Sequence, residues 1–334
     1  MSARLDATPG LANLRGMSER KIAVVLFNLG GPDSLDAVKP FLRNLFSDPA
    51  IITLPAIFRL PLARFIAGRR ESKAKKIYAQ IGGASPILGQ TEMQAQALQE
   101  ALATGGNYWD DWRCFVCMRY WHPMTEKVVQ DVRRFAPEQI VLLPLYPQFS
   151  TTTTGSSFSA WDAAVARLGV KTRRVKSYAT EPGFIDASVE LLKQGLDEAG
   201  PQPVRVLFSA HGLPEKIIAA GDPYQGEVEQ TAGAIMAQLG GVDWSVCYQS
   251  RVGPLKWIGP STEAEIQRAA ADKKAIVLYP LSFVSEHSET LVELDIDYKR
   301  LAMEAGVPAY IRVPTVGTHP KFIEGLARLV RDAL

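Results

Sequence analysis

The sequence has little of what a disulfide scaffold, a membrane span or a nucleic-acid surface requires. It holds three cysteines in 334 residues, which excludes a disulfide framework and fits a reducing, cytoplasmic setting. No apolar run approaches the ~20 residues of a membrane helix. Residues 1–20 lack the apolar core of a signal peptide, and we expect a disordered tail there. The formal net charge is only +2, so we expect no nucleic-acid partner.

Two of the three cysteines form a C-x-x-C pair, a spacing that binds metals in some proteins. Cys114 and Cys117 fall in a segment whose pattern predicts a strand. Strand residues three apart face opposite sides of a sheet. We therefore expect two half-buried strand cysteines rather than two ligands of one metal.

The composition is that of a globular protein, with 47% hydrophobic and 22% charged residues. Short apolar runs alternate with helical patterns along the chain. Strands that are apolar on both faces and separated by helices form parallel sheets covered on both sides, so the fold class is α/β, doubly wound. Strands are predicted at 21–29, 113–120, 139–146, 172–178, 204–209, 244–250, 275–281 and 309–313. Helices are predicted at 91–103, 125–135, 157–168, 184–199, 224–239 and 262–271.

The alternation runs twice, and the length also favours two domains. Val25-Leu-Phe-Asn-Leu-Gly resembles Val206-Leu-Phe-Ser-Ala-His-Gly. We predict two similar Rossmann-like domains, residues 21–175 and 176–316, followed by a C-terminal helix at 317–334. Ligands of such sheets bind at the carboxyl ends of the strands, so we expect the site in the cleft between the domains.

Polar, aromatic and glycine residues gather directly after the predicted strands. Three of the four histidines stand there, at positions 122, 211 and 287. Surface loops without a function would rarely hold so many. This clustering is the strongest indication of a site that the residues give by themselves.

Residues 50–88 interrupt the alternation. Apolar side chains are interleaved there with Arg59, Arg64, Arg69 and Arg70, and a run of lysines follows. Such a segment fits a lid over a flat, anionic, apolar ligand or a contact with a membrane surface. It also fits an ordinary pair of amphipathic helices that covers the sheet.

One histidine and a row of carboxylates are the candidates for chemistry. His211 directly follows a strand, and a pKa near neutrality suits a proton acceptor. Acidic residues then recur at three- and four-residue steps, which places them along one face of a helix, with His287 at its start. The row is either a solvated acidic face or a path for protons and loosely held divalent ions. Its members are Glu286, Glu289, Glu293 and Asp297.

Two other chemistries fit poorly. Ser209 and His211 stand two apart on one predicted strand, but the serine is not in a G-x-S-x-G elbow. We therefore rank a hydrolase third among the readings. Gly30-Gly31-Pro32 lacks the G-x-G-x-x-G spacing of a nucleotide-binding loop.

Seven motifs, in order along the chain from about residue 21, resemble the ferrochelatase family. They are Phe27-Asn-Leu-Gly-Gly-Pro, Ile81-Gly-Gly-Ala-Ser-Pro-Ile, Met118-Arg-Tyr-Trp-His-Pro, Leu145-Tyr-Pro-Gln-Phe-Ser-Thr-Thr-Thr-Thr-Gly-Ser, Phe208-Ser-Ala-His-Gly-Leu-Pro, Tyr248-Gln-Ser-Arg-Val-Gly-Pro-Leu-Lys-Trp and Phe283-Val-Ser-Glu-His-Ser-Glu-Thr-Leu. The resemblance implies insertion of Fe²⁺ into protoporphyrin IX, the terminal step of heme biosynthesis, with release of two protons. It implies iron and a porphyrin as substrates and no organic cofactor.

The resemblance also implies roles for individual residues. His211 and Glu289 match the catalytic and metal-binding pair of the family, and Glu286, His287 and Glu293 match its proton and metal path. Residues 54–87 match the lip of the porphyrin site, where Arg70 and Ser85 would bind porphyrin carboxylates. The remaining pocket positions implied are Leu29, Arg119, Tyr120, Tyr146, Trp257 and Phe283.

One departure concerns an iron–sulfur cluster. Some relatives carry a [2Fe–2S] cluster, which needs four cysteine ligands, whereas this chain has three and places Thr151 where some relatives place a ligand. We expect no cluster, and a peripheral contact of the lip with the inner face of the cell membrane. A coproporphyrin or other tetrapyrrole chelatase and a non-catalytic tetrapyrrole carrier are the alternatives.

Overall fold

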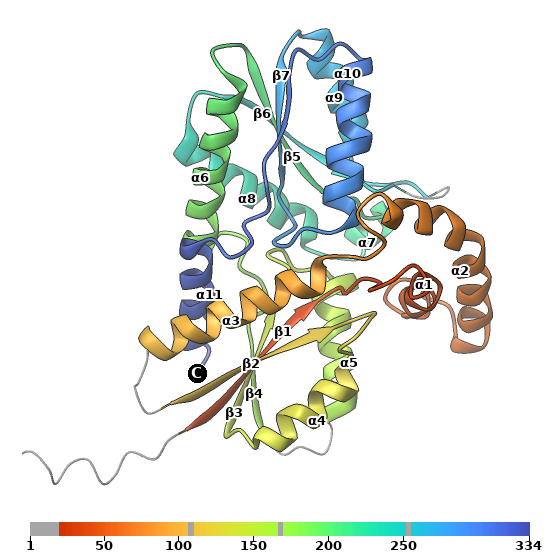
Figure 1. The fold of residues 1–334 in the computed structure, drawn as a ribbon, viewed down its shortest axis with the longest axis vertical. Coiled ribbons are helices and arrows are strands. Elements are labelled where there is room, and N and C mark those ends of the chain that lie inside the picture. Colours follow the sequence, from red (N-terminus) through yellow and green to blue (C-terminus); the bar gives the residue numbers. More distant parts are fainter. Residues whose placement is uncertain (1–19, 106–109, 166–169, 252–254) are drawn as a thin grey trace, which may run out of the picture.

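The computed structural model describes residues 20–105, 110–165, 170–251 and 255–334 (Figure 1). The expected tail at 1–20 therefore lies outside the described residues except for Arg20. That residue is ordered by Asp110, whose Oδ2 accepts from its Nη2 at 2.7 Å.

The strands form two parallel four-stranded sheets, which confirms the predicted α/β class. The first sheet has the order β2-β1-β3-β4 and the second β6-β5-β7-β8. The two orders are equivalent, so the repeated sequence pattern does reflect two similar halves. The strands of the first sheet are β1 (Lys21–Asn28), β2 (Asp111–Met118), β3 (Gln139–Pro144) and β4 (Lys171–Arg174). Those of the second are β5 (Val204–His211), β6 (Asp243–Gln249), β7 (Ala275–Pro280) and β8 (Tyr310–Arg312).

Helices connect the strands, and three of them match the predicted bounds. In the first half they are α1 (Val38–Phe46), α2 (Ala56–Ala79), α3 (Ile87–Gly105), α4 (Thr125–Phe135), the short π-helix η2 (Thr151–Gly155) and α5 (Ser156–Val165). In the second half they are α6 (Pro182–Ala199), α7 (Glu215–Ala219), α8 (Tyr224–Leu239), α9 (Thr262–Ala271), the π-helix η3 (Glu289–Tyr298), α10 (Lys299–Glu304) and α11 (Pro320–Asp332). None of the described helices is long and apolar enough to cross a membrane.

The core follows from the alternation of apolar residues along the strands. Val24 of β1 and Phe208 of β5 belong to one continuous core that joins both halves and is covered by α3, α6, α8 and α11. Val25 faces the opposite side, toward α4 and α5. Leu207 faces α9, η3 and α10. Each sheet is thus buried on both faces, as strands that are apolar on both faces require.

Cys114 and Cys117 both lie on β2 and face opposite sides as predicted, but Cys117 is fully buried, because the α4 side of the sheet is closed, and only Cys114 is half-buried. Cys117 packs on the α4 side of the first sheet, whereas Cys114 packs toward the opposite core. Burial raises the pKa of both thiols to about 12, so they are protonated at neutral pH. Two protonated thiols on opposite faces of a sheet cannot bind one metal.

The topology brings the sequence-predicted residues to two equivalent places. In each sheet the chain reverses its direction of winding between the first and third strands, β1 and β3 or β5 and β7. Such switch points hold ligands in open α/β sheets. Leu29 and Tyr146 follow β1 and β3, and His211 and Phe283 stand at the ends of β5 and β7.

One buried glutamine holds the two halves together beside the second switch point. Gln94 of α3 is fully buried. Its Nε2 donates to Val284 O at 2.7 Å and to Gly317 O at 2.9 Å, and its Oε1 accepts from Ser285 Oγ at 2.8 Å. All three contacts join the first half of the chain to the second. The loop between β7 and η3 is therefore fixed by the first domain, because a buried amide is costly unless its hydrogen bonds are made.

Candidate active site

A carboxylate between two imidazoles forms the centre of the site. Oε1 of Glu289 lies 3.8 Å from His211 Nε2, and Oε2 lies 3.7 Å from His287 Nε2. His211 is the last residue of β5 and Glu289 the first of η3. The structure therefore brings together three residues that sequence reasoning had selected from two distant segments.

The hydrogen bonds of the two imidazoles fix where their protons lie. His211 Nδ1 is 2.7 Å from Gly212 O, and His287 Nδ1 is 3.1 Å from Ser285 O. A carbonyl oxygen only accepts, so each Nδ1 carries a hydrogen. In a neutral imidazole this leaves the lone pair on Nε2. Both Nε2 atoms face Glu289, so a proton taken up on either one is stabilised by that carboxylate.

Glu289 and Glu293, the next acidic residue along η3, have pKa values that are shifted in opposite directions. Burial acts to raise the pKa of Glu289, but the neighbouring charges of His211 and His287 outweigh it and lower that pKa. Burial, and then the charge of Glu289, raise the pKa of Glu293 above its usual range. Two nearby carboxyl groups whose environments separate their pKa values are suited to different roles in proton transfer.

Glu293 is held by donors from the second sheet. Its Oε1 accepts from Ser250 N at 2.9 Å and lies 3.1 Å from Tyr298 Oη. Its Oε2 accepts from Ser250 Oγ and from Gln249 Nε2, the latter at 3.2 Å. The same Gln249 amide lies 3.3 Å from the backbone oxygen of Glu289, so one side chain contacts both Glu289 and Glu293.

The acidic row does not form the single helical face that was expected. Glu286 precedes η3, and a π-helix is wider than an α-helix, so residues four apart do not stack as the spacing predicts. Arg312 Nη1 donates to Glu286 Oε1 at 2.6 Å, while its Nε and Nη2 donate to the two oxygens of Asp295. Burial acts to raise the pKa of Glu286, but Arg312 outweighs it and lowers that pKa. The second oxygen of Glu286 has no hydrogen-bond partner among the described residues.

The first domain contributes an anchored arginine. Arg119, after β2, forms an ion pair with Asp48 at 2.6 Å and donates from Nε to Ser156 Oγ at 2.7 Å. Tyr120 donates to the same Asp48 carboxylate at 2.8 Å and is 1% exposed. The Tyr120 ring lies against Arg119, with the guanidinium 5.0 Å from its centre, and its place in the pocket stays a prediction.

The other predicted binding residues are half-buried. Phe283 packs on the His287 ring with centroids 4.6 Å apart, and the Trp257 strand segment pairs with Pro214, close to His211. Ser85 approaches the loop after β1 so closely that a Cβ on Gly31 would lie 2.5 Å from its side chain. Arg70 of α2 lies 5.7 Å from the Phe46 ring centre. Leu29, Ser85, Tyr146, Trp257 and Phe283 all keep partial exposure.

The geometry bears on two other kinds of site, a hydrolase centre and a metal site of three or more side chains. Ser209 is fully buried and donates to Gln249 Oε1 at 2.7 Å, so it is not available as the nucleophile of a hydrolase. Among the residues that the structure describes, no group of three His, Cys, Asp or Glu side chains has the geometry of a metal site.

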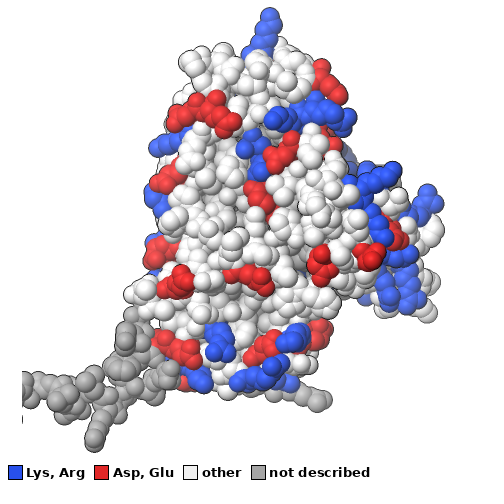
Figure 2. All heavy atoms as spheres, viewed as in Figure 1, with Lys and Arg blue, Asp and Glu red and all other residues white. Residues whose placement is uncertain are grey.

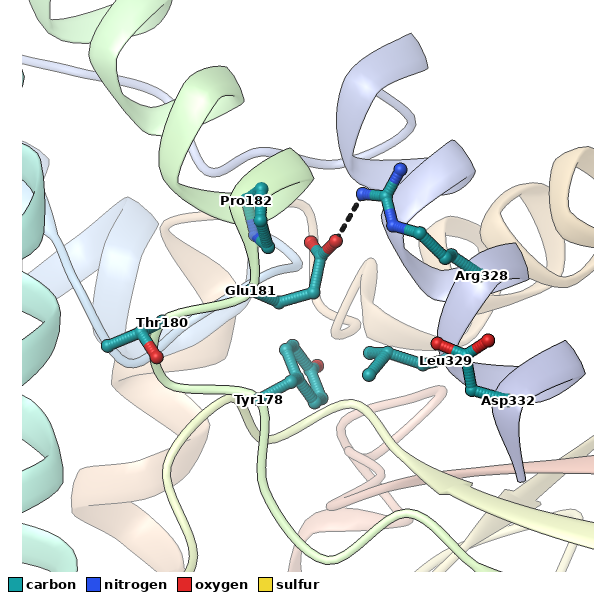
Figure 3. A pocket seen from close by; sticks show the side chains of 7 residues that line it. All are labelled: Tyr178, Thr180, Glu181, Pro182, Arg328, Leu329 and Asp332. Carbon is teal, nitrogen blue, oxygen red and sulfur yellow. Dashed lines mark hydrogen bonds and ion pairs between the residues drawn. The ribbon is translucent and has the colours of Figure 1, made fainter.

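A separate cavity of about 310 Å³ lies between α6 and α11 (Figure 3). Tyr178, Leu329 and the ion pair of Glu181 with Arg328 line it, and none of the sequence-predicted site residues does. Glu181 also accepts from Phe184 N at 2.8 Å and caps α6. The ion pair therefore fixes the segment that connects the domains rather than belonging to the candidate site.

Three positions important to this geometry were missed from the sequence. Asp48 orders Arg119, Arg312 joins Glu286 of the acidic row to Asp295, and Gln94 joins the two halves of the chain. Each stands in a segment without a motif, and only the tertiary structure shows what it contacts. Burial of a charged or amide side chain would have marked these positions, but the sequence alone does not show which polar side chains are buried.

Comparison with known proteins identifies one family. The family model described as ferrochelatase matches residues 21–334. Proteins named ferrochelatase from Caulobacter vibrioides (strain NA1000 / CB15N) and Phenylobacterium zucineum (strain HLK1) are 56% and 52% identical to this chain. The first alignment covers 94% of this chain and 91% of the relative, and the second covers 94% and 92%.

Two solved structures share the fold at low sequence identity. SirB from Bacillus subtilis with Fe³⁺ superimposes with a TM-score of 0.57 at 12% identity and covers 94% of this chain and 95% of that chain. CbiX, described as the terminal enzyme for biosynthesis of siroheme in denitrifying bacteria, gives 0.51 at 15% identity and covers 94% and 100%. These likenesses confirm the arrangement of the two sheets.

Proposed function

Because the chain belongs to the ferrochelatase family and is an enzyme that inserts Fe²⁺ into protoporphyrin IX, we propose that His211 is the base and Glu289 its partner. The observation that carries the proposal is the pair of contacts at 3.7 and 3.8 Å that place Glu289 between two imidazoles. Fe²⁺ and the porphyrin are substrates, and the residues must take up two protons while the metal enters.

The proton steps follow from the tautomers. The lone pair on His211 Nε2 accepts a proton from a pyrrole nitrogen, and the electron pair of the broken N–H bond stays on that nitrogen to bind iron. The imidazolium is stabilised by the Glu289 carboxylate beside it. The proton then passes from His211 Nε2 to Glu289 Oε1, which restores the neutral imidazole, and from Glu289 to Glu293, the favoured acceptor because its pKa is raised while that of Glu289 is lowered. The second pyrrole proton follows the same steps. His287 stands on the other oxygen of Glu289 and completes the same path.

The iron ligands are the same groups. His211 and Glu289 present an imidazole nitrogen and a carboxylate oxygen, which suit a divalent ion that must be released again. Glu286 lies three residues before Glu289 with one carboxylate oxygen without a partner among the described residues. We propose that it supports the entrance of this path while Arg312 holds its other oxygen.

The porphyrin is held from both domains. Arg70 and Ser85 of the lip bind its carboxylates, and Arg119 is kept rigid by Asp48 for contact with the ring or a carboxylate. Leu29, Tyr146, Trp257 and Phe283 supply apolar walls. Bulky side chains on both sides of the ring favour the bent porphyrin, whose nitrogen lone pairs point toward the metal. The site thus binds a distorted ring more strongly than a flat one.

Replacement of Glu289 by glutamine tests the proposed path. Glutamine has the same shape but carries no charge and cannot take up a proton at neutral pH. We expect kcat for Fe²⁺ insertion to fall about 100-fold and KM for the porphyrin to change by less than about twofold. Anaerobic assays of heme absorbance give both constants. Glu324→Gln on exposed α11 is the matched control, and an unchanged kcat in Glu289→Gln would remove Glu289 from the path.

The lip provides the surface for a peripheral membrane contact, which we propose at the inner face of the cell membrane of a cytoplasmic protein. Ile57, Phe58 and Phe65 of α2 are 75%, 65% and 60% exposed. Lysine and arginine side chains gather over the same helix, as Figure 2 shows at the right of the molecule. Apolar side chains beside cations on one helix suit the interface of an anionic bilayer.

Serine at both Ile57 and Phe58 is expected to lower binding to anionic vesicles by at least about 10-fold, because full burial of each apolar side chain is worth about 1.5–3 kcal/mol. Co-sedimentation with vesicles that contain phosphatidylserine measures this binding. Met303→Ser, at a site of 61% exposure on α10, is the control. Equal sedimentation of all three proteins would contradict the membrane contact.

We also infer that the cysteines of this chain hold no [2Fe–2S] cluster. Four thiolates are needed, whereas Cys114 and Cys117 lie on opposite faces of one sheet and Cys247 is buried in the other. Burial also raises the pKa of Cys247 to about 12. Visible absorption bands of a cluster in the purified protein would contradict this inference.

A further inference from the structure

We propose that Tyr298 and Glu263 form the exit through which protons leave Glu293 for solvent. The inference rests on the proposed path through His211 and Glu289, and extends it by two residues that no motif marked. Tyr298 ends η3, and Glu263 stands in the first turn of α9. The exit therefore leaves the π-helix and crosses to a neighbouring helix instead of following the acidic row.

The contacts are continuous from the buried carboxylate to the surface. The hydroxyl of Tyr298 is 3.1 Å from Glu293 Oε1 and 3.2 Å from Glu263 Oε1. The Tyr298 side chain is buried, with 4% of its surface exposed. Glu263 is exposed. A single hydroxyl is thus the only link needed between a carboxylate inside the site and one that water reaches.

The number of hydrogens in this contact indicates a shared proton. A phenol has one hydrogen and can donate it to one carboxylate at a time. If both carboxylates were ionised, one of them would face the phenol oxygen as a second acceptor, with no hydrogen between the two oxygens. Both contacts are hydrogen bonds when one carboxyl group is protonated and donates to the phenol oxygen. Glu293 is the group that holds this proton, because it is the more buried of the two and lies near the charge of Glu289.

The transfer step is balanced. The O–H bond of protonated Glu293 breaks, and its proton binds the oxygen of Tyr298. The original Tyr298 proton passes at the same time to Glu263 Oε1, and from there to water. One proton moves from Glu293 to Glu263, and the phenol is neutral before and after. A concerted transfer is favoured over a stepwise route through a phenolate, because burial raises the pKa of Tyr298 well above its usual range.

The last member of the acidic row is placed differently. Asp297 is exposed and lies 3.4 Å from Arg300 in an ion pair at the surface. The bonds that leave Glu293 outward go to Tyr298 and not to the next carboxylate at the helical spacing.

The decisive variants are Tyr298→Phe and Glu263→Gln. The first removes one oxygen and keeps the buried ring, and the second replaces an exposed carboxylate by its isostere. Tyr310→Phe is the matched control, because Tyr310 Oη donates to Leu294 O of the same π-helix at 2.7 Å. It removes one buried hydroxyl contact with η3 without touching a carboxylate.

We expect Tyr298→Phe to lower kcat for Fe²⁺ insertion roughly 10-fold, below the 10²–10⁴-fold typical of a positioned acid or base because the group is remote from the porphyrin. The solvent isotope effect on kcat, measured in H₂O and D₂O, should rise in the variant as proton exit becomes rate-limiting. Glu263→Gln should change both quantities in the same direction. Tyr310→Phe should leave the isotope effect at the wild-type value.

Wild-type kcat and isotope effect in both Tyr298→Phe and Glu263→Gln would overturn the exit. Equal changes in Tyr310→Phe and Tyr298→Phe would also overturn it, because they would show only a role in holding η3. The surface position of Glu263 keeps the test decisive even where Tyr298→Phe lowers stability. Failure of the exit is distinguishable from failure of the proposed base, because His211→Ala tests the base in the same assay independently of either residue.

Discussion

Alanine at His211 is expected to lower kcat for Fe²⁺ insertion about 1,000-fold, within the range that a positioned proton acceptor contributes. The variant loses the Nε2 lone pair that lies beside Glu289, and water in its place is a weaker base. Porphyrin affinity should change little, because His211 is one small contact among the walls of both domains. Anaerobic assays that follow porphyrin fluorescence and heme absorbance measure turnover, and fluorescence quenching of the protein measures binding.

His319→Ala is the matched control. This histidine caps α11 and lies 3.1 Å from Glu190, outside the site, so turnover should persist when it is removed. Turnover that survives in His211→Ala would move the base to another group, with His287 the next candidate because its lone pair faces the same carboxylate. Parallel assays with coproporphyrin and protoporphyrin measure the substrate preference that the apolar lip is expected to set.

The parts of the fold that depend on local pattern could be predicted from the sequence. Alternating strands and helices specify parallel sheets because no other arrangement buries strands that are apolar on both faces. His211 could be selected because it directly follows such a strand, and parallel topology brings strand ends to one edge. Glu289 could be placed in a polar row after β7, whereas its pairing with His211 was implied by the family resemblance.

The π-helix could not be predicted, and the reason is physical. Its hydrogen bonds run from residue i to i+5, but no side-chain pattern distinguishes this winding from an α-helix over two or three turns. The acidic residues of η3 therefore seemed to share one face. In the structure Glu293 faces Tyr298 and Ser250, whereas Glu286, the first member of the row, precedes η3 and faces Arg312. Long-range partners from β6 and β8 decide these directions, and sequence spacing contains no information about them.

Tyr120 shows the same limit at the first switch point. It stands next to Arg119 after a strand, where a pocket residue is expected. Its hydroxyl instead binds Asp48, which lies more than 70 residues earlier in the chain. Burying a carboxylate requires several donors at once, and Arg119, Tyr120 and Ser156 supply them. Tyr120 and Arg119 are thus held by the same carboxylate, a contact that the sequence does not reveal.

Methionine at Arg312 should destabilise the protein by about 3 kcal/mol, because removal of one partner leaves a buried charge without compensation. The side chains of Arg312 and Glu286 are each 12% exposed, whereas Asp295 is 32% exposed and can be solvated. Most of the loss therefore comes from Glu286. Urea unfolding followed by circular dichroism measures the change. The double variant Arg312→Met/Glu286→Gln is the control, and it should recover a large part of the lost stability.

The pH dependence of the same variant gives a sharper test. In the wild type Arg312 lowers the pKa of Glu286, so the pair contributes stability above the ordinary glutamate pKa and loses it as pH falls through the lowered folded value. Without Arg312, burial raises the pKa of Glu286, and the variant binds a proton more readily than the unfolded chain. The stability difference between wild type and variant should thus be largest near neutral pH and shrink toward about pH 4.

A stability difference that stays constant with pH would show that Arg312 acts through packing rather than through charge.

The expected kcat of the Arg312→Met variant follows from the same contacts. Arg312 joins Glu286, three residues before η3, to Asp295 in the middle of η3. A π-helix is less stable than the α-helix it replaces. Loss of this link should let η3 relax toward α-helical winding and rotate Glu293 away from Ser250 and Tyr298. We therefore expect kcat to fall together with stability, and the double variant to recover stability but not kcat.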